Sequence, residues 1–212
     1  MDSYEEGALR LIRVGPLGPY ANNAYIIADG NSGEAAIVDM PPGSEELLEV
    51  LAGLRVTAIL LTHSHPDHIA AYDLVKGATG APILCHPAEE MLPTDRIDQP
   101  LADGREIQVG GLSVRAIHTP GHTPGSTCFL VVRYLISGDT LFPGGPGHTN
   151  SPQELQQIIQ AITQRLYVLP DDTLVLPAHG DGTTIGDSKR EYAVFASRPH
   201  PPDLCGDVLW EC

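Results

Sequence analysis

Four side chains of types that can bind metal ions lie within one short segment, HSHPDH, which spans residues 63–68. This segment holds three of the nine histidines of the chain together with one aspartate, Asp67. Crowded imidazoles repel one another when they are protonated, whereas a divalent cation binds neutral imidazole and carboxylate groups at the same time. The residue types and their spacing therefore predict a metal site.

The segment follows an apolar run, residues 56–62, which is typical of a buried strand, and we expect a helix to begin near His68. In α/β folds, ligands bind at the carboxyl ends of strands. Because His63 and His65 are two residues apart, an extended backbone points both imidazoles to the same side. Asp67 and His68 follow at the turn into the helix, so all four side chains converge on a small volume.

Further candidate ligands follow other apolar runs of the sequence. They are His118 and His122 in the loop HTPGHTPGST, Asp139 in SGDT, and His179 and Asp181 in LPAHGD. The residues alone leave open which of these complete the site. The other three histidines are not expected to bind a metal, because His86 is predicted at the start of a helix and His148 and His200 in loops.

The alternation of apolar runs with turn signals predicts the elements that position these residues. Strands are expected at residues 8–14, 23–29, 34–40, 56–62, 81–85, 126–132, 134–139 and 172–178, and a hairpin at 104–119. Further helices are expected at residues 44–54, 151–166 and about 187–196. Ser44 and Ser151 are the expected N-caps, and Glu154 forms a capping box with Ser151. The hairpin is expected to turn at Gly110–Gly111.

Two parts of the chain repeat one order of elements, which is strand, strand, Asp, helix, strand, His. The Asp and the His of this order are Asp39 and His63 in the first part, and Asp139 and His179 in the second part. This repeat predicts two similar β-sheets that pack face to face, with helices outside. It also places the two histidines at corresponding strand ends, and the two aspartates likewise.

The composition is that of one globular domain spanning residues 1–212, with residues 198–212 as a C-terminal tail. The formal net charge of −15 disfavours binding to nucleic acid and to anionic membranes, which leaves a small-molecule substrate as the expected partner. The sequence shows no membrane span and no secretory signal, so we expect a cytoplasmic protein. The four cysteines are expected to be reduced, with a Cys205–Cys212 disulfide as the alternative.

The pattern HxHxDH, followed by PGHTPG, by SGDT and by a strand ending in a histidine, resembles the metallo-β-lactamase superfamily. Within it, the chain is most similar to the glyoxalase II (hydroxyacylglutathione hydrolase) branch, over about residues 10–190. The resemblance implies an α/β fold, a four-layer αββα sandwich of two mixed sheets, and two divalent metal ions. Carried over by motif, His63, His65 and His122 bind the first ion, Asp67, His68 and His179 bind the second, and Asp139 bridges them.

The resemblance also implies a hydrolase in which a metal-bridging hydroxide attacks a small acyl substrate, first of all a thioester of the hydroxyacylglutathione type. Asp67 would orient the hydroxide as well as bind a metal. Zinc is expected, and iron or manganese suit the same ligands. Two other activities remain open. One is persulfide oxidation at a single iron held by His63, His122 and Asp139, and the other is hydrolysis of a lactone or a β-lactam.

The sequence departs from the family pattern near the site and at the C-terminus. Ala70 and Ala71 stand where family members often have two glycines, which predicts slightly shifted helix packing beside the site. His148 stands near the place of a basic residue in family members and is a candidate for substrate binding. A short tail after Pro199 replaces the glutathione-binding extension of glyoxalase II. Its apolar residues, among them Trp210, are expected to pack on the chain itself or to border the pocket or a homodimer interface.

Overall fold

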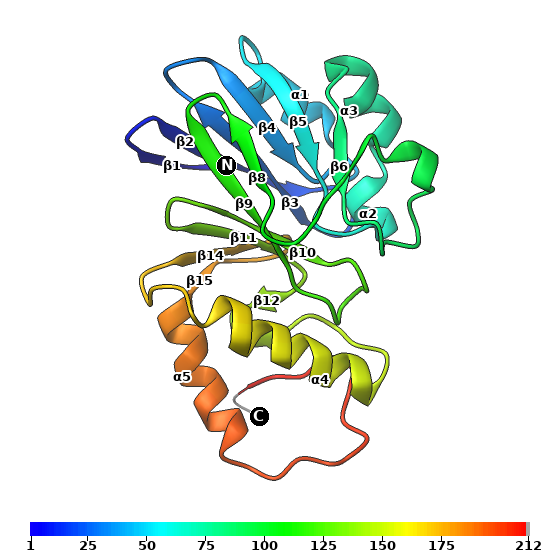
Figure 1. Cartoon of the computed structure of the whole chain (residues 1–212), viewed down its shortest axis with the longest axis vertical. Coiled ribbons are helices and arrows are strands. Elements are labelled where there is room, and N and C mark those ends of the chain that lie inside the picture. Colours follow the sequence, from blue (N-terminus) through cyan, green and yellow to red (C-terminus); the bar gives the residue numbers. More distant parts are fainter. Residues whose placement is uncertain (211–212) are drawn as a thin grey trace.

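The computed structural model of the chain describes residues 1–210. Two large mixed β-sheets pack face to face, and helices cover both outer faces (Figure 1). This arrangement is the αββα sandwich that the sequence predicts. Cys212, and with it the expected alternative of a Cys205–Cys212 disulfide, lies outside the described residues.

The first sheet contains seven strands in chain order. They are β1 (Asp2–Glu6), β2 (Leu9–Leu17), β3 (Asn22–Asp29), β4 (Glu34–Val38), β5 (Arg55–Leu60), β6 (Ile83–Cys85) and β7 (Gln99–Pro100). Neighbours are antiparallel as far as β4 and parallel from β4 to β7. The helices beside this sheet are α1 (Glu45–Val50), α2 (Pro66–Ile69) and α3 (Tyr72–Thr79), and a 3₁₀ turn spans Thr94–Arg96.

The second sheet contains six strands in the order β15-β14-β11-β10-β9-β8. Their bounds are β8 (Glu106–Val109), β9 (Leu112–His118), β10 (Thr127–Val131), β11 (Tyr134–Gly138), β14 (Leu174–Pro177) and β15 (Thr183–Thr184). A separate two-stranded ribbon joins β12 (Leu141–Phe142) to β13 (Gly145–Pro146). The outer face is covered by α4 (Pro152–Ala161), its π-helical continuation (Ile162–Leu166) and α5 (Ile185–Ala196).

The apolar core has three layers, because each sheet is buried on both faces. All eight residues of β3 are buried, as expected for a central strand with neighbouring layers on both sides. Tyr25 and Ile27 belong to the layer between the two sheets, whereas Ile26 belongs to the layer under α1 and α3. A third layer lies between the second sheet and α4 and α5, and it includes Ile158 and Trp210.

The repeat in the sequence is also a repeat in the structure. β4 pairs with β5 in parallel across the crossover helix α1, and β11 pairs with β14 in parallel across α4. Asp39 and Asp139 each follow the first strand of their pair, and His63 and His179 follow the second. The ends of these four strands therefore carry the chemically informative residues, as predicted.

Several local predictions were wrong. Ser44 does not cap α1, because its hydroxyl donates to the Pro41 carbonyl at 2.6 Å. The helix predicted at residues 151–166 changes to π-helical winding after Ala161. Ser151 does cap α4, but Glu154 accepts from the Asn150 N–H rather than from Ser151. Among residues 1–210, no helix is long and apolar enough to cross a membrane.

Candidate metal centre

Seven His and Asp side chains meet at the edge of the sandwich where strands of both sheets end. Four follow β5, and the others lie after β9, β11 and β14. Their candidate ligand atoms form three overlapping groups, and within each group all atoms lie within 4.8 Å of one another. The groups are His63–His65–His122, His63–His68–Asp139 and Asp67–His68–His179.

The first group consists of three imidazoles from two loops. His65 Nδ1 lies 3.0 Å from His63 Nε2 and 3.0 Å from His122 Nε2. Asp139 Oδ2 adds a carboxylate oxygen 3.6 Å from His122 Nε2. Three nitrogens and one oxygen are thus gathered around one point.

The second group combines two imidazoles with a carboxylate. Asp67 Oδ2 lies 3.5 Å from His68 Nε2 and 3.4 Å from His179 Nε2. Asp139 Oδ1 is 3.7 Å from His68 Nε2, and Asp139 Oδ2 is 3.7 Å from His179 Nε2. Asp139 therefore borders both groups.

These separations fit divalent metal ions. Ligand atoms about 2.0–2.1 Å from a tetrahedral zinc ion lie about 3.3–3.4 Å from one another. The separations found here, from 3.0 to 3.7 Å, bracket that value. Within residues 1–210, His68 Nε2 and Asp139 Oδ1 are buried atoms with no hydrogen-bond partner. Buried polar atoms are normally paired, so a cation between these two atoms accounts for their position.

Asp39 fixes the orientation of two of the rings. His68 Nδ1 donates to Asp39 Oδ2 at 2.9 Å, which leaves Nε2 free to face the centre. The Thr62 hydroxyl also donates to Asp39 Oδ2 at 2.7 Å, and the same hydroxyl lies 3.1 Å from His63 Nδ1. Asp39 has a φ of +64°, a left-handed conformation that side-chain-bearing residues rarely adopt and that often marks a functional site.

Two backbone carbonyls and one side-chain amide position three further ligands. His122 Nδ1 donates to the His148 carbonyl at 2.8 Å, and His179 Nδ1 donates to the Tyr20 carbonyl at 3.0 Å. The Asn22 amide donates to Asp67 Oδ2 at 2.9 Å. Partners of this kind set the ring orientation and the basicity of metal-binding histidines.

A buried carboxylate, Glu89, joins the two loops that carry the three imidazoles of the first group. Glu89 is only 5% exposed, and its Oε2 accepts from the Ser64 N–H at 2.7 Å and from the Ser64 hydroxyl at 2.6 Å. Its other oxygen, Oε1, accepts from the Thr123 hydroxyl. Ser64 lies between His63 and His65, and Thr123 follows His122. One side chain therefore sets the spacing between these two loops.

The charges in the centre are strongly coupled. Burial, together with the neighbouring imidazoles, holds the pKa of His63 well below its usual value, so this ring is neutral. Burial opposes protonation of His68 as well, but the carboxylates of Asp39, Asp139 and Asp67 together outweigh it and raise the pKa of His68 to about 9. Burial acts to raise the pKa of Asp67, yet hydrogen bonds from His179 and Asn22 and the charge of His68 lower it overall. A proton on His68 and a divalent cation are thus alternative partners for the same carboxylates.

The other candidates of the sequence lie apart from this cluster. His118 is not part of the three groups, and its ring stacks on that of His86 at a centroid distance of 3.9 Å. His86 lies in a turn rather than at the start of a helix as predicted. The Asp181 side chain is 97% exposed and approaches Arg13 at 4.0 Å. His148 lies in a loop as expected and lines a pocket beside the centre, where its Nδ1 is 3.0 Å from Asp207 Oδ1.

Three residues that shape the centre, Asp39, Asn22 and Glu89, were not assigned a role from the sequence. Asp39 had a signal, since the repeat places it opposite Asp139. Glu89 had none, because it lies 25 residues from Ser64 and reaches it only in the folded chain. Contacts of this kind depend on tertiary structure and follow no spacing rule.

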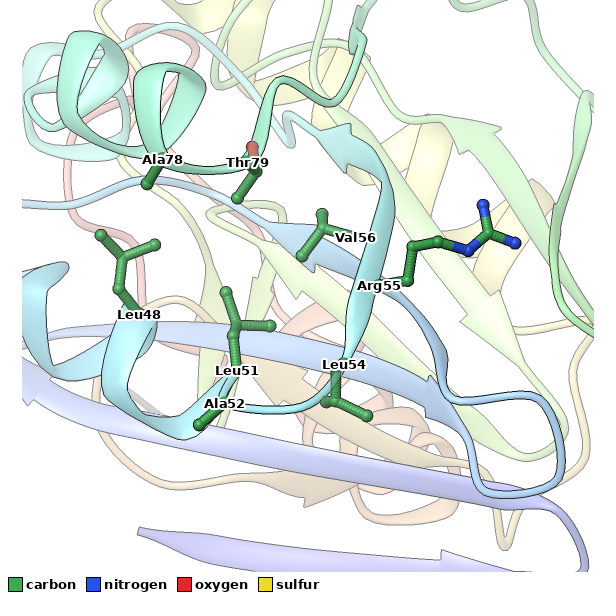
Figure 2. A pocket seen from close by; sticks show the side chains of 8 residues that line it. All are labelled: Leu48, Leu51, Ala52, Leu54, Arg55, Val56, Ala78 and Thr79. Atoms are coloured by element: carbon green, nitrogen blue, oxygen red, sulfur yellow. The ribbon is translucent and has the colours of Figure 1, made fainter.

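A cleft of about 410 Å³ lies away from the centre, between α1, β5 and α3. Figure 2 shows that its walls are mainly aliphatic and that the Arg55 side chain extends away from them. Arg55 begins β5, whereas His63 follows the other end of that strand. At about 3.3 Å per residue, the strand separates the two by roughly 25 Å. We therefore assign the chemistry to the His and Asp cluster rather than to this cleft.

Comparison with known proteins agrees with this geometry. The sequence pattern of the Metallo-beta-lactamase superfamily matches residues 17–179. The hydroxyacylglutathione hydrolase GloC of Haemophilus influenzae is 31% identical over 210 residues, which are 88% of this chain and 99% of that protein.

Solved structures of proteins with this fold also superpose on the chain. The B3 metallo-beta-lactamase BLEG-1 superposes with a TM-score of 0.74 and 31% identity, over 85% of this chain and 96% of that one. TTHA1623, solved in a di-iron-bound form, has a TM-score of 0.72 and 31% identity, over 84% and 97% of the two chains. Since the matched region contains every candidate ligand from His63 to His179, the chain belongs to the metallo-β-lactamase superfamily.

Proposed function

We propose that this protein hydrolyses a small acyl thioester, of the type that hydroxyacylglutathione represents, with the help of two divalent metal ions. The observation that carries the proposal is the position of Asp139 between two sets of ligand atoms. Its Oδ1 faces His68, and its Oδ2 faces His122 and His179. A carboxylate shared in this way is suited to hold two cations at the short separation that two-metal hydrolases use.

In the proposed site, His63, His65 and His122 hold the first ion, Asp67, His68 and His179 hold the second, and Asp139 contacts both. When bound, the ions supply an activated water at neutral pH and polarise the substrate carbonyl. Asp67 is ionised, because its pKa is lowered, and its carboxylate can accept a hydrogen bond from that water and orient it. Asn22, which donates to Asp67 Oδ2, keeps this carboxylate in place.

The reaction needs no protein nucleophile. The water oxygen forms a new bond to the acyl carbon, the carbon–sulfur bond breaks, and the products are a carboxylate, a thiol and a released proton. A thiolate leaves readily without prior protonation. Burial raises the pKa of Cys85 to about 12 and that of Cys128 to about 11, so neither thiol is suited to covalent catalysis.

The relatives support hydrolysis as the reaction class, but they differ in the substrate that they favour. A hydroxyacylglutathione hydrolase favours a thioester, whereas a B3 metallo-beta-lactamase of equal identity favours a β-lactam. The thioester is preferred because a thiolate leaving group departs without prior protonation, whereas the amine leaving group of a β-lactam must be protonated.

Elemental analysis of the purified protein, followed by assays on a 2-hydroxyacyl thioester, a lactone, a β-lactam and a persulfide, tests the proposal. We expect two metal ions per chain and thiol release from the thioester. One iron per chain with oxygen consumption on the persulfide would instead make the protein a dioxygenase that uses His63, His122 and Asp139. Faster turnover of the lactone or the β-lactam would assign the site to that substrate class.

A further inference from the structure

A pocket of about 300 Å³ opens directly beside the candidate metal centre, and two of the proposed ligands, His122 and Asp139, belong to its lining. One wall is the segment of residues 142–148, which follows Asp139 and includes β13. The other wall is formed by residues 207–209 of the C-terminal tail. The tail therefore borders the space that a substrate must occupy next to the metals.

The tail is fixed in this position by its own contacts. Trp210 is fully buried, packs against Phe195 with ring centroids 5.0 Å apart, and donates its backbone N–H to the Gly144 carbonyl at 2.7 Å. Thr149 and Gly206 exchange two backbone hydrogen bonds of 2.8 and 3.2 Å. The wall is thus part of the folded structure beside the candidate metal centre.

The chemistry of the walls is apolar, with one polar pair. The apolar side chains are Phe142, Pro143, Pro146, Val208 and Leu209. The polar pair is His148 and Asp207, whose Nδ1 and Oδ1 are 3.0 Å apart. Within residues 1–210, no Lys or Arg lines this pocket.

A second hollow, of about 200 Å³, is lined in part by His65 and His122, and no Lys or Arg among the described residues lines it. Glu89, Glu90 and Glu154 belong to its lining. With a net charge of −15 on the whole chain, the surroundings of the centre are negative apart from the metals themselves. Like charges brought together are strongly unfavourable in a binding site, and neither hollow offers a counter-charge for a carboxylate.

We infer that the thiol half of the substrate carries no net negative charge, and that residues 207–209 of the tail select it. This inference rests on the thioester hydrolysis proposed above. The thiol half lies against the apolar wall, with Asp207 and His148 available for hydrogen bonds to neutral amide or hydroxyl groups. A thiol that bears free carboxylates, such as glutathione, is disfavoured by Asp207 and by the glutamates of the second hollow.

The test compares two thioesters that share one 2-hydroxyacyl group, one of N-acetylcysteamine, which is neutral, and one of glutathione, which is anionic. With the metal-loaded protein we expect kcat/KM to be at least about tenfold higher for the neutral thioester. Equal or faster turnover of the glutathione thioester overturns the inference while leaving thioester hydrolysis intact.

Charge reversal in the tail assigns the selection to residues 207–209. Asp207→Lys is expected to shift the ratio of the two kcat/KM values toward glutathione by about 3–10-fold, since one repulsion is replaced by one attraction at a solvent-exposed position. The matched control is Asp203→Lys, which makes the same charge change at an exposed tail residue outside the pocket. An equal shift in both variants would mean that overall charge, and not the pocket wall, sets the preference.

Binding is measured separately from turnover with the uncleavable thioether analogues of both thiols, by calorimetry on the metal-loaded protein. Tighter binding of the neutral thioether is expected, and equal or tighter binding of the glutathione thioether contradicts the inference. If neither thioester is hydrolysed but the neutral thioether binds more tightly, the reaction class is wrong and the charge selection stands. The two proposals can therefore fail independently.

Discussion

The two halves of the chain repeat one topology but hold their ligands in different ways. In the first half, His63 and His68 are each only 1% exposed, and side chains such as Asp39 and Glu89 hold the loop in place. The side chain of Asp67, on the same loop, is 21% exposed. In the second half, the side chains of His122, Asp139 and His179 are 8%, 13% and 27% exposed, and backbone carbonyls fix the rings of His122 and His179.

This difference separates two tasks that a metal-dependent hydrolase must combine. A buried, hydrogen-bonded side defines the positions of the metals with little freedom, which favours binding of the ions. An open side leaves room for a substrate, and the pocket formed by residues 142–148 and 207–209 lies there. The same order of elements thus gives two fully buried imidazoles in one half, and in the other half ligands that line the pocket proposed for the substrate.

The largest effect is expected at the residue that joins the halves. Asp139→Ala should lower the total metal content and abolish turnover, since the carboxylate borders both groups of ligand atoms. Elemental analysis and a thioester assay measure this. His86→Ala is the control, because this histidine stacks on His118 outside the cluster. Metal loss in the control and none in Asp139→Ala would show that the ligand assignment is wrong.

A smaller effect on metal binding is expected when the hydrogen bonds that hold the ligand loops of the first half are weakened. Glu89→Gln keeps the size of the side chain but turns one acceptor of the Ser64 or Thr123 hydrogen bonds into a donor. We expect metal affinity at the first group to fall by about 10–100-fold, the usual cost of losing a partner that positions the ligands. Competition with a chromogenic chelator measures this.

The neighbouring Glu90 provides the matched control, because it is exposed and borders the same hollow. Glu90→Gln should leave metal affinity unchanged. Equal affinities in the two variants would show that Glu89 does not set the spacing of the loops, and that the first half owes its metal affinity to Asp39 and the ligands alone.

In both halves the sequence predicts the longer elements and misses the shorter ones. The strands and crossover helices follow from apolar periodicity, and the repeat that links Asp39 with Asp139 predicts the sandwich. β1 was missed because its sequence, DSYEE, is acidic, although its backbone pairs with β2 along its full length. The two-residue strands β7, β12, β13 and β15 are too short to have a pattern of their own.

For the site, residue type was a better guide than local structure. The seven candidate ligands follow strand ends and share metal-binding chemistry, so the sequence and the family resemblance both pointed to them. The side chains that orient them could not be found in this way, because Glu89 and Asn22 act through tertiary contacts. The position of the tail beside the pocket could not be predicted either, because no local pattern specifies the path of the chain after α5.

Stability is expected to depend on the tail of the second half. Trp210→Ala should lower the free energy of unfolding by about 3–5 kcal/mol, the usual cost of removing a fully buried large aromatic side chain. Denaturant unfolding measures this. Leu209→Ala, at a residue 54% exposed, is the control and should cost far less. If Trp210→Ala costs as little stability as Leu209→Ala, the tail stabilises the fold through its backbone hydrogen bonds and not through the buried indole.

The smallest effect concerns the two alanines that follow the HSHPDH segment where relatives often have glycines. Ala70 has φ and ψ of −58° and −31°, an ordinary helical conformation, and its side chain is exposed. Ala70→Gly should therefore lower the free energy of unfolding by about 0.5–1 kcal/mol, through backbone entropy alone. Ala71 is 9% exposed, so Ala71→Gly also removes a buried methyl and should cost about 0.8 kcal/mol more. Metal affinity should be the same in both variants, because the loop is held by Asp39 and Glu89. A tenfold change in metal affinity with little change in stability would show instead that the backbone after His68 positions the ligands, and that the first half is less rigid than its hydrogen bonds indicate.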